Sequence, residues 1–496
     1  MSRGKKTFIL TLILVCLYQG IALAGSQYSS QWSVKPQLSQ KFPAKYTEVE
    51  GILTFRGNQQ RSAPSYGTTD MKLFRPKIAW EKKTKSSSWG GGAGWTGQPA
   101  IVKWSPEVLK TMNVKAKFLA QPGFTEVIYA SLDGYVYFME LETGEETRSP
   151  IKIGNPIKGS VSVDARGYPL LYVGEGIPEN GTIGFNLFSL TDQKRLLRVS
   201  GKDPFAYRSW GAFDSSAMFN REDDTLIVGG ENGLVYHLKL NTVFNPARKT
   251  ITIDPIISKY RYKIAGNAYQ GIENSLAIHE NLAFFADNGG SLQALNLNTY
   301  TSEWSLPPVD DTDATIVLET EGGVPFLYTG TEVDKQGRSG QSYIRKINGL
   351  TGAVVWQNEY KSFSVLGEHP INGGLLATPV VGKHEIANLV IFTIARYDTF
   401  NGGLMVALDK TTGKEAWRLP MKNYAWSSPV DVYDQAGRAY LIQANSVGQI
   451  SVIRASNGQV AGSLNIGTNI ESSPAVFNNY AVVASRGGKI YGIKLE

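Results

Sequence analysis

Apolar and polar residues alternate in short runs along most of this chain, and each run begins at a glycine. The clearest run spans residues 403–417 (GLMVALDKTTGKEAW), where an alternating segment is followed by a Thr-Gly turn and a tryptophan. Alternation with a period of two predicts β-strands, and the intervening glycines predict tight turns. Related runs begin at Gly134, Gly184, Gly233, Gly290, Gly340, Gly448 and Gly488.

The runs recur about every 50 residues, a period typical of propellers and solenoids. Each unit opens with a short polar sequence, of which Ser427-Ser-Pro429 and Ser472-Ser-Pro474 are the most regular. Units that bury their faces only against their neighbours form one continuous body, so a length of 496 residues does not require several domains. The pattern predicts an all-β protein built of four-stranded antiparallel units, and no window predicts a long amphipathic helix.

The two ends of the repeat region complement each other. The last unit ends at Glu496 after its third strand, and the strand around Trp80 has no strands before it. An N-terminal strand that joins the C-terminal unit closes the ring and removes its free edges. We expect an eight-bladed β-propeller over residues 76–496, with seven blades as the alternative if residues 155–200 form only a partial blade. Residues 25–75 are expected to be an irregular N-terminal segment lying on this body.

The first 24 residues have the features of a secretory signal. A basic start precedes an apolar stretch from Phe8 to Leu17, which is shorter than the ~20 residues of a membrane span. Residues 22–24 (ALA) match a signal-peptidase site. We expect a signal peptide over residues 1–24, no transmembrane segment in the mature chain, and a periplasmic or secreted location. An uncleaved anchor is the alternative.

Cysteine content and charge exclude several function classes. The only cysteine is Cys16 inside the predicted signal, so the mature chain is expected to have no disulfide, thiol nucleophile or thiolate metal site. The net charge of +7 falls to about +4 without the leader. Basic residues form short clusters, such as residues 81–85, and no basic stripe interleaved with aromatics occurs. This distribution favours a solvated surface over nucleic-acid binding.

Residues 407–417 carry the tag Ala-x-Asp-x-x-Thr-Gly-x-x-x-Trp, which resembles the repeat of the PQQ-like β-propeller family. The match is good at 340–356 and partial at 290–304 and 134–144, and the resemblance extends over nearly all of residues 76–496. It implies that each tryptophan docks between neighbouring blades. The family includes quinoprotein alcohol dehydrogenases and a non-enzymatic outer-membrane protein assembly lipoprotein, so the tag is specific for fold and nearly silent on function.

The quinoprotein members of that family imply adjacent cysteines over the cofactor, a Ca²⁺ held by carboxylate and amide ligands, and an aspartate base. This chain has no adjacent cysteines and no Cys-x-x-Cys-His haem motif. Carboxylates and amides do occur where units begin, so PQQ with calcium remains an alternative. We favour the interpretation that these groups solvate a wet channel and cap turns. They are Asp214, Glu273, Asn274, Asp313 and Glu471.

The starts of the units are expected to surround the central channel, where aromatic and charged side chains would gather. Indoles at a channel entrance can stack on a sugar or on an aromatic group of a peptide. For each tryptophan, the competing interpretation is that the ring packs between neighbouring blades. The candidate ligand-binding residues are Trp95, Arg208, Trp210, Glu273, Asn274, Trp426 and Glu471.

The chain is expected to be a monomeric, exported binding or scaffold protein for a protein or polysaccharide partner, with no catalytic residues and no cofactor. His384-Glu-Ile-Ala-Asn388 lacks the second histidine of a zinc protease motif, and neither a Gly-x-Ser-x-Gly elbow nor a P-loop occurs. A PQQ- and calcium-dependent dehydrogenase is the first alternative. A carbohydrate-binding or carbohydrate-active propeller is the second.

Overall fold

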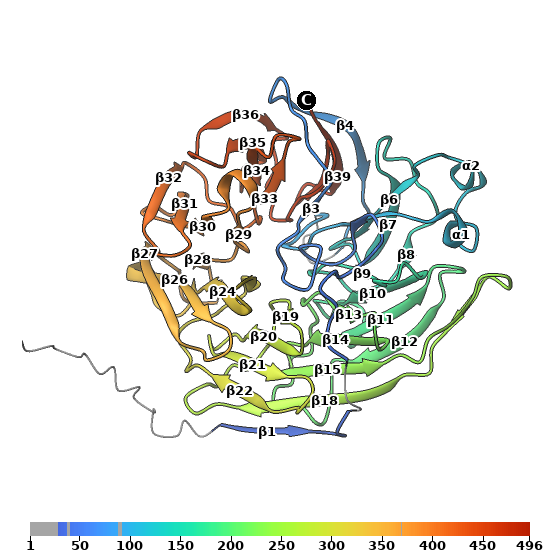
Figure 1. Cartoon of the computed structure of the whole chain (residues 1–496), viewed down its shortest axis with the longest axis horizontal. Coiled ribbons are helices and arrows are strands. Elements are labelled where there is room, and N and C mark those ends of the chain that lie inside the picture. Colours follow the sequence, from blue (N-terminus) through green and yellow to red (C-terminus); the bar gives the residue numbers. More distant parts are fainter. Residues whose placement is uncertain (1–27, 37–39, 88–91, 369) are drawn as a thin grey trace, which may run out of the picture.

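Eight antiparallel β-sheets surround a central axis in the computed structural model, which describes residues 28–36, 40–87, 92–368 and 370–496 (Figure 1). The predicted signal over residues 1–24 lies outside the described residues. Within the described part of the chain, no helix has the length and apolar character needed to cross a bilayer. The arrangement confirms the all-β, eight-bladed propeller predicted from the repeat.

Each blade has four strands, which follow one another in order from the axis outward. The first four blades are β5 (Ala100–Lys103), β6 (Thr125–Ala130), β7 (Tyr135–Glu140) and β8 (Ile151–Lys152); β9 (Ser162–Val163), β10 (Leu170–Gly174), β11 (Gly184–Ser189) and β12 (Arg195–Ser200); β13 (Met218–Asn220), β14 (Thr225–Gly229), β15 (Leu234–Lys239) and β18 (Ile256–Lys263); β19 (Ala277–His279), β20 (Leu282–Ala286), β21 (Leu292–Asn296) and β22 (Ser302–Ser305).

The other four blades follow the same order. They are β23 (Val317–Glu321), β24 (Val324–Gly330), β26 (Gly340–Asn348) and β27 (Val354–Ser362); β29 (Val380–Val381), β30 (Leu389–Ala395), β31 (Gly403–Asp409) and β32 (Glu415–Met421); β33 (Val430–Tyr433), β34 (Ala439–Ala444), β35 (Gln449–Arg454) and β36 (Val460–Asn465); β37 (Ala475–Phe477), β38 (Tyr480–Ser485), β39 (Lys489–Leu495) and β4 (Pro76–Lys83). Short additions are α1 (Pro106–Leu109), α2 (Ala116–Leu119), the hairpin β16 (Val243–Asn245) and β17 (Thr250–Thr252), β25 (Glu332–Val333), β28 (Gly373–Gly374), and 3-10 turns at Gly337–Ser339 and His384–Ile386.

The ring closes as the sequence predicted. Strand β4 pairs antiparallel with β39, with Trp80 opposite Gly492, so an N-terminal strand completes the C-terminal blade. Strands β9 to β12 form a complete second blade, and the seven-bladed alternative is therefore wrong. The middle strands of the blades, such as β30, are buried on both faces because a blade packs against each side, whereas the outer strand β32 alternates between exposed and half-buried residues.

The tryptophans dock between blades, as the resemblance implied. The indole Nε1 of Trp80 donates to the Leu141 carbonyl of the next blade, at 2.8 Å. A Cβ added at Gly144 would lie 2.4 Å from Cδ2 of Trp80, so the Thr-Gly turn presents bare backbone to the ring. The same donation, at 2.8–3.0 Å, links Trp304 to Gly349, Trp356 to Lys410 and Trp417 to Ala455.

Part of the N-terminal segment fills the centre of the ring instead of lying on its surface. Strand β2 (Gly51–Ile52) pairs with β5, and β3 (Ser65–Tyr66) runs parallel to β37. Between them, the fully buried Arg56 donates to the carbonyls of Pro379 and Pro429 at 2.7 and 2.6 Å. We call residues 51–66 the plug. Farther upstream, β1 (Ser29–Trp32) adds a fifth strand to the edge of the third blade beside β18.

A second buried arginine ties the plug to the other side of the ring. Arg61 donates to the carbonyls of Leu276 and Ser216 at 2.8 and 2.9 Å. Burial lowers the pKa of Arg56 to about 10 and that of Arg61 to about 9, so both guanidinium groups are charged at neutral pH. The two arginines thus bind carbonyls from four different blades, and the plug closes the middle of the channel.

Candidate functional site

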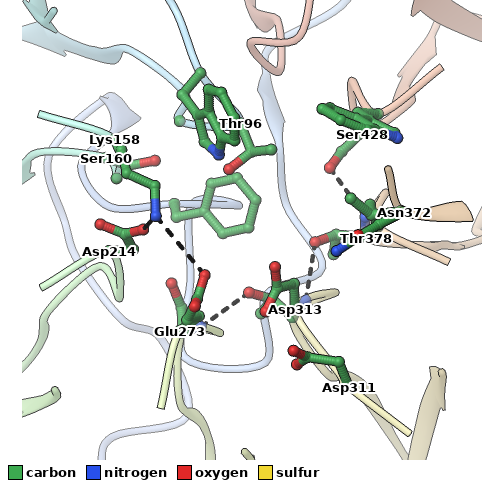
Figure 2. Close-up of a pocket in the computed structure, with 18 residues that line it drawn as sticks. Thr96, Lys158, Ser160, Asp214, Glu273, Asp311, Asp313, Asn372, Thr378 and Ser428 are labelled. Carbon is green, nitrogen blue, oxygen red and sulfur yellow. Dashed lines mark hydrogen bonds and ion pairs between the residues drawn. The ribbon is translucent and has the colours of Figure 1, made fainter. Parts of the chain in front are cut away.

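A ring of hydrogen bonds at the axis positions the site. Near the start of six of the eight described inner strands, a backbone N–H donates to a side-chain hydroxyl at the same repeat position in the next blade, and the bond from Thr378 to Ser428 is visible in Figure 2. This is the structural role of the Ser-Ser-Pro series. The bonds, of 2.8–3.2 Å, run from Gln98 to Ser160, Ser216 to Ser275, Ser275 to Thr315, Thr315 to Thr378, Thr378 to Ser428, and Ser428 to Ser473.

The residue two positions before each ring position forms the wall of an axial cavity of about 230 Å³, which we call the funnel. Phe55 of the plug also lines the funnel, so the plug forms its base. Of the eight residues at this repeat position, Glu471 is the exception that does not line the funnel. The seven others are Thr96, Lys158, Asp214, Glu273, Asp313, Leu376 and Trp426.

Three of the candidate residues predicted from the sequence meet in the funnel. Trp95 and Trp426 lie with ring centroids 6.1 Å apart, and Glu273 lines the same cavity. Arg208 and Trp210 stand behind this wall. The Arg208 guanidinium donates to Oδ1 of Asn288 and the Trp210 indole donates to Oε2 of Glu231, both at 2.7 Å.

The other two candidates do not line the funnel. Asn274 is buried, and its side-chain amide donates to the carbonyls of Ala286 and Thr312 at 2.8 and 2.9 Å, which joins neighbouring blades. Glu471 accepts a hydrogen bond from Asn469 at 2.8 Å. Sequence reasoning placed both at the channel because they adjoin the ring positions, but Asn274 joins two blades and Glu471 contacts Asn469 and, at 3.6 Å, the Nε of Arg486.

Sequence reasoning missed Lys158, which is the centre of the funnel's charge network (Figure 2). Its Nζ forms a close ion pair with Asp214 and lies 3.8 Å from Oε1 of Glu231 and 3.8 Å from Oε2 of Glu273. Each of the three acids has a carboxylate oxygen within 4.8 Å of the others. Glu273 also accepts from the Asn288 amide at 2.8 Å. Lys158 stands at the repeat position that lines the funnel, so the register of the repeat was the available signal.

Burial and mutual repulsion set the ionisation of this group. Burial raises the pKa of Asp214 and, together with the charge of Glu273, holds the pKa of Glu231 well above its usual range. Burial opposes ionisation of Glu273 as well, but the Lys158 ammonium and hydrogen bonds lower its pKa. Burial also opposes the charge of Lys158, yet the three acids raise its pKa well above the ordinary value. Lys158 is therefore a firmly protonated ammonium.

A second acidic group continues along the same wall (Figure 2). Asp311 and Asp313 line the funnel, and Glu332 lies behind them, where it accepts from the Asn372 amide at 3.1 Å. Burial, followed by repulsion among these carboxylates and Glu273, holds the pKa values of Asp311, Asp313 and Glu332 well above their usual range. The funnel thus offers indoles, one ammonium and a wall of carboxyl groups that hold or release protons.

No family model matches this chain, and no curated protein matches its sequence. Solved structures that resemble it include BamB from Moraxella catarrhalis, with 16% identity and a TM-score of 0.49 over 74% of this chain and 93% of BamB. A europium-containing methanol dehydrogenase has 12% identity and a TM-score of 0.46 over 90% of this chain and 98% of the enzyme. The quinohemoprotein alcohol dehydrogenase of Comamonas testosteroni has 12% identity and a TM-score of 0.45 over 90% and 80%. Similarity at this level concerns the fold alone and carries no argument about activity.

Proposed function

We propose that this chain is an exported, monomeric, non-catalytic binding protein that takes a polar group of a protein or polysaccharide partner into the funnel. The observation that carries the proposal is the funnel itself, a cavity of about 230 Å³ with Phe55 of the plug at its base. Pockets for drug-sized ligands measure roughly 300–1,000 Å³. The funnel is smaller, which suits one sugar ring or one side chain at the end of a larger partner.

The chemistry of the walls suits such a group. Aromatic rings stack on the apolar faces of sugars and on aromatic side chains. Carboxylates accept hydrogen bonds from hydroxyl and ammonium groups, and each ionised carboxylate has two acceptor oxygens. The pair formed by Trp95 and Trp426 lines the same cavity as Glu273 and Asp313. This pairing of indoles with carboxylates favours a carbohydrate ligand as the more specific form of the proposal.

The quinoprotein alternative is not supported by the residues present. The carboxylates of Asp214, Glu231 and Glu273 already surround the ammonium of Lys158. Two cations do not share one set of ligands at this distance. The residues of the wild-type chain therefore do not fit calcium at this position, and we derive no quinone-dependent step.

The experiment is a titration of the purified mature protein with a panel of oligosaccharides and of short peptides, followed by tryptophan fluorescence and melting temperature. A ligand that binds only the folded state raises the melting temperature. We expect a saturable fluorescence change that falls at least ~10-fold in affinity in Trp426→Ala, because stacking contributes on the order of 1 kcal/mol or more. Tyr207→Ala, at an exposed site outside the funnel, is the matched control.

Two results would contradict the proposal. One is a partner that binds Trp95→Ala, Trp426→Ala and the wild-type protein with equal affinity, which would place its site elsewhere on the propeller. The other is turnover of a bound glycan, which would show a carbohydrate-active enzyme. N-terminal sequencing of the exported protein tests the predicted start near Gly25, and its elution volume in size-exclusion chromatography tests the monomer.

A further inference from the structure

We propose that Lys158 is a built-in replacement for a divalent cation, and that one uncharged substitution at this position converts the funnel into a calcium site. The ligands of that site are the carboxylates of Asp214, Glu231 and Glu273. In the native chain, the lysine ammonium occupies the space between them and excludes metal ions.

The spacing of the carboxylates is the first argument. Calcium binds oxygen ligands at about 2.3–2.6 Å, so ligands on opposite sides of one ion stand roughly 5 Å apart. One carboxylate oxygen from each of Asp214, Glu231 and Glu273 lies within 4.8 Å of the other two, inside that span. The Nζ of Lys158 contacts Asp214 and lies 3.8 Å from an oxygen of each of the other two acids.

Unused acceptor atoms are the second argument. Oδ1 of Asp214 and Oε1 of Glu231 are buried and have no hydrogen bond to a group outside this acidic cluster, and the Glu231 side chain is only 2% exposed. The 3.8 Å separations are too long for hydrogen bonds, so the ammonium stabilises Glu231 and Glu273 through charge alone. Buried carboxylate oxygens with free lone pairs are what a hard cation binds.

The charge balance is the third argument. Of the described residues, Lys158 is the only base within 4.0 Å of any of these three carboxylates. Arg208 donates to Asn288 instead, and the Nζ of Lys335 donates to the Asn288 carbonyl at 2.6 Å. Removing the charge of Lys158 would therefore leave the three buried acids without a direct ion pair, and the charge of Arg208, which also lowers the pKa of Glu273, would act on them from beyond ion-pair distance.

The stem of Lys158 is held in place as well. A Cβ added at Gly176 would lie 2.7 Å from Cγ of Lys158, so the absence of a side chain at Gly176 makes room for the stem. The Lys158 side chain is 13% exposed, and its Nζ lies 5.8 Å from the ring centroid of Trp95. A side chain packed in this way keeps its ammonium among the carboxylates, which is why the wild-type protein is expected to reject metal ions.

The test compares the wild-type protein with Lys158→Met, which keeps an unbranched chain and removes the charge. Terbium is titrated into each protein, and its luminescence is excited through tryptophan, since Trp95 lies beside the site. We expect no saturable signal from the wild-type protein. Lys158→Met should give a saturable signal with a midpoint of about 100 μM or below, displaced by calcium. Calcium should also raise the melting temperature of Lys158→Met and leave that of the wild-type protein unchanged.

Two further variants separate this effect from a general gain in metal binding. Lys158→Arg keeps the charge and should bind no terbium. Adding Glu231→Gln to Lys158→Met removes one ligand and should weaken binding at least ~10-fold.

Three results would overturn the proposal. In the first, the wild-type protein binds terbium as tightly as Lys158→Met does. In the second, Lys158→Met folds but gives no terbium signal. In the third, Lys158→Met stays unfolded even in millimolar calcium. Recovery of folding by calcium alone would support it, because the ion would then replace the lysine charge.

Discussion

Replacing Arg61 with methionine tests whether the plug holds the blades together. The Arg61 guanidinium is fully buried and donates four hydrogen bonds of 2.8–2.9 Å, to the carbonyls of Leu276, Phe55 and Ser216 and to the hydroxyl of Thr54. Methionine retains an unbranched chain of similar reach and donates none of these bonds. The substitution therefore leaves three buried carbonyls without this donor at the centre of the ring.

The expected loss follows from these contacts. Each hydrogen bond from a charged donor contributes about 1.5–3 kcal/mol, but removing the guanidinium also removes the penalty for burying its charge. A buried acceptor left without its donor costs about 1–3 kcal/mol, and Arg61→Met leaves three such carbonyls, so we expect a loss of about 4 kcal/mol. The predicted mature chain, residues 25–496, has an unfolding entropy near 1 kcal/mol per kelvin, so the melting temperature should fall by about 4 °C.

Melting followed by circular dichroism, together with urea unfolding, measures this loss. Arg438→Met is the matched control, because that side chain is 67% exposed and its ion pair with Asp434 is screened by solvent, so its loss should leave the melting temperature almost unchanged. The reasoning is refuted if Arg61→Met and Arg438→Met both melt within about 1 °C of the wild-type protein. That result would mean that the blades are stable without the buried donors of the plug.

Two further predictions concern the blade turns and a buried histidine. Gly144→Ala should lower the unfolding free energy by about 3 kcal/mol, because the φ of Gly144 is 68° and an added Cβ would lie 2.4 Å from Cδ2 of Trp80. Gly123→Ala is the control: its φ is 69° but no atom lies within 4 Å of the added Cβ, so the loss should be only about 1 kcal/mol. Equal losses in urea unfolding would argue against the docking of Trp80 on this turn. Burial lowers the pKa of His237 to about 4, below its value of about 6.5 in the unfolded chain, so the unfolded state takes up the proton first as the pH falls. His237 therefore contributes up to about 3 kcal/mol of stability at neutral pH, and this contribution is lost as the pH falls from 6.5 towards 4. The unfolding free energies of the wild-type protein and of His237→Gln are compared between pH 7 and pH 4.5. If their difference stays constant over this range, the assignment is contradicted.

The repeat determined the architecture because its signals are local. Alternating residues and turn glycines determine strands and turns within a few positions of the chain, as in residues 403–417. The sequence also shows an unpaired strand at Trp80 and a last unit that lacks its fourth strand, and these two pair in the structure. The same register identifies most of the funnel wall, since Glu273 and Trp426 stand at equivalent positions of their units. These parts of the protein follow from the sequence by itself.

The tertiary structure alone decided the plug and the charge network. Arg56 donates to Pro429, which is 373 positions away, and no local pattern in the polar N-terminal segment indicates that contact. Glu231 lies in a turn between β14 and β15, outside the repeat position that lines the funnel, yet it adjoins Lys158 because consecutive blades converge at the axis. Side-chain contacts of this kind depend on how blades pack, and packing joins residues without regard to their separation in the sequence.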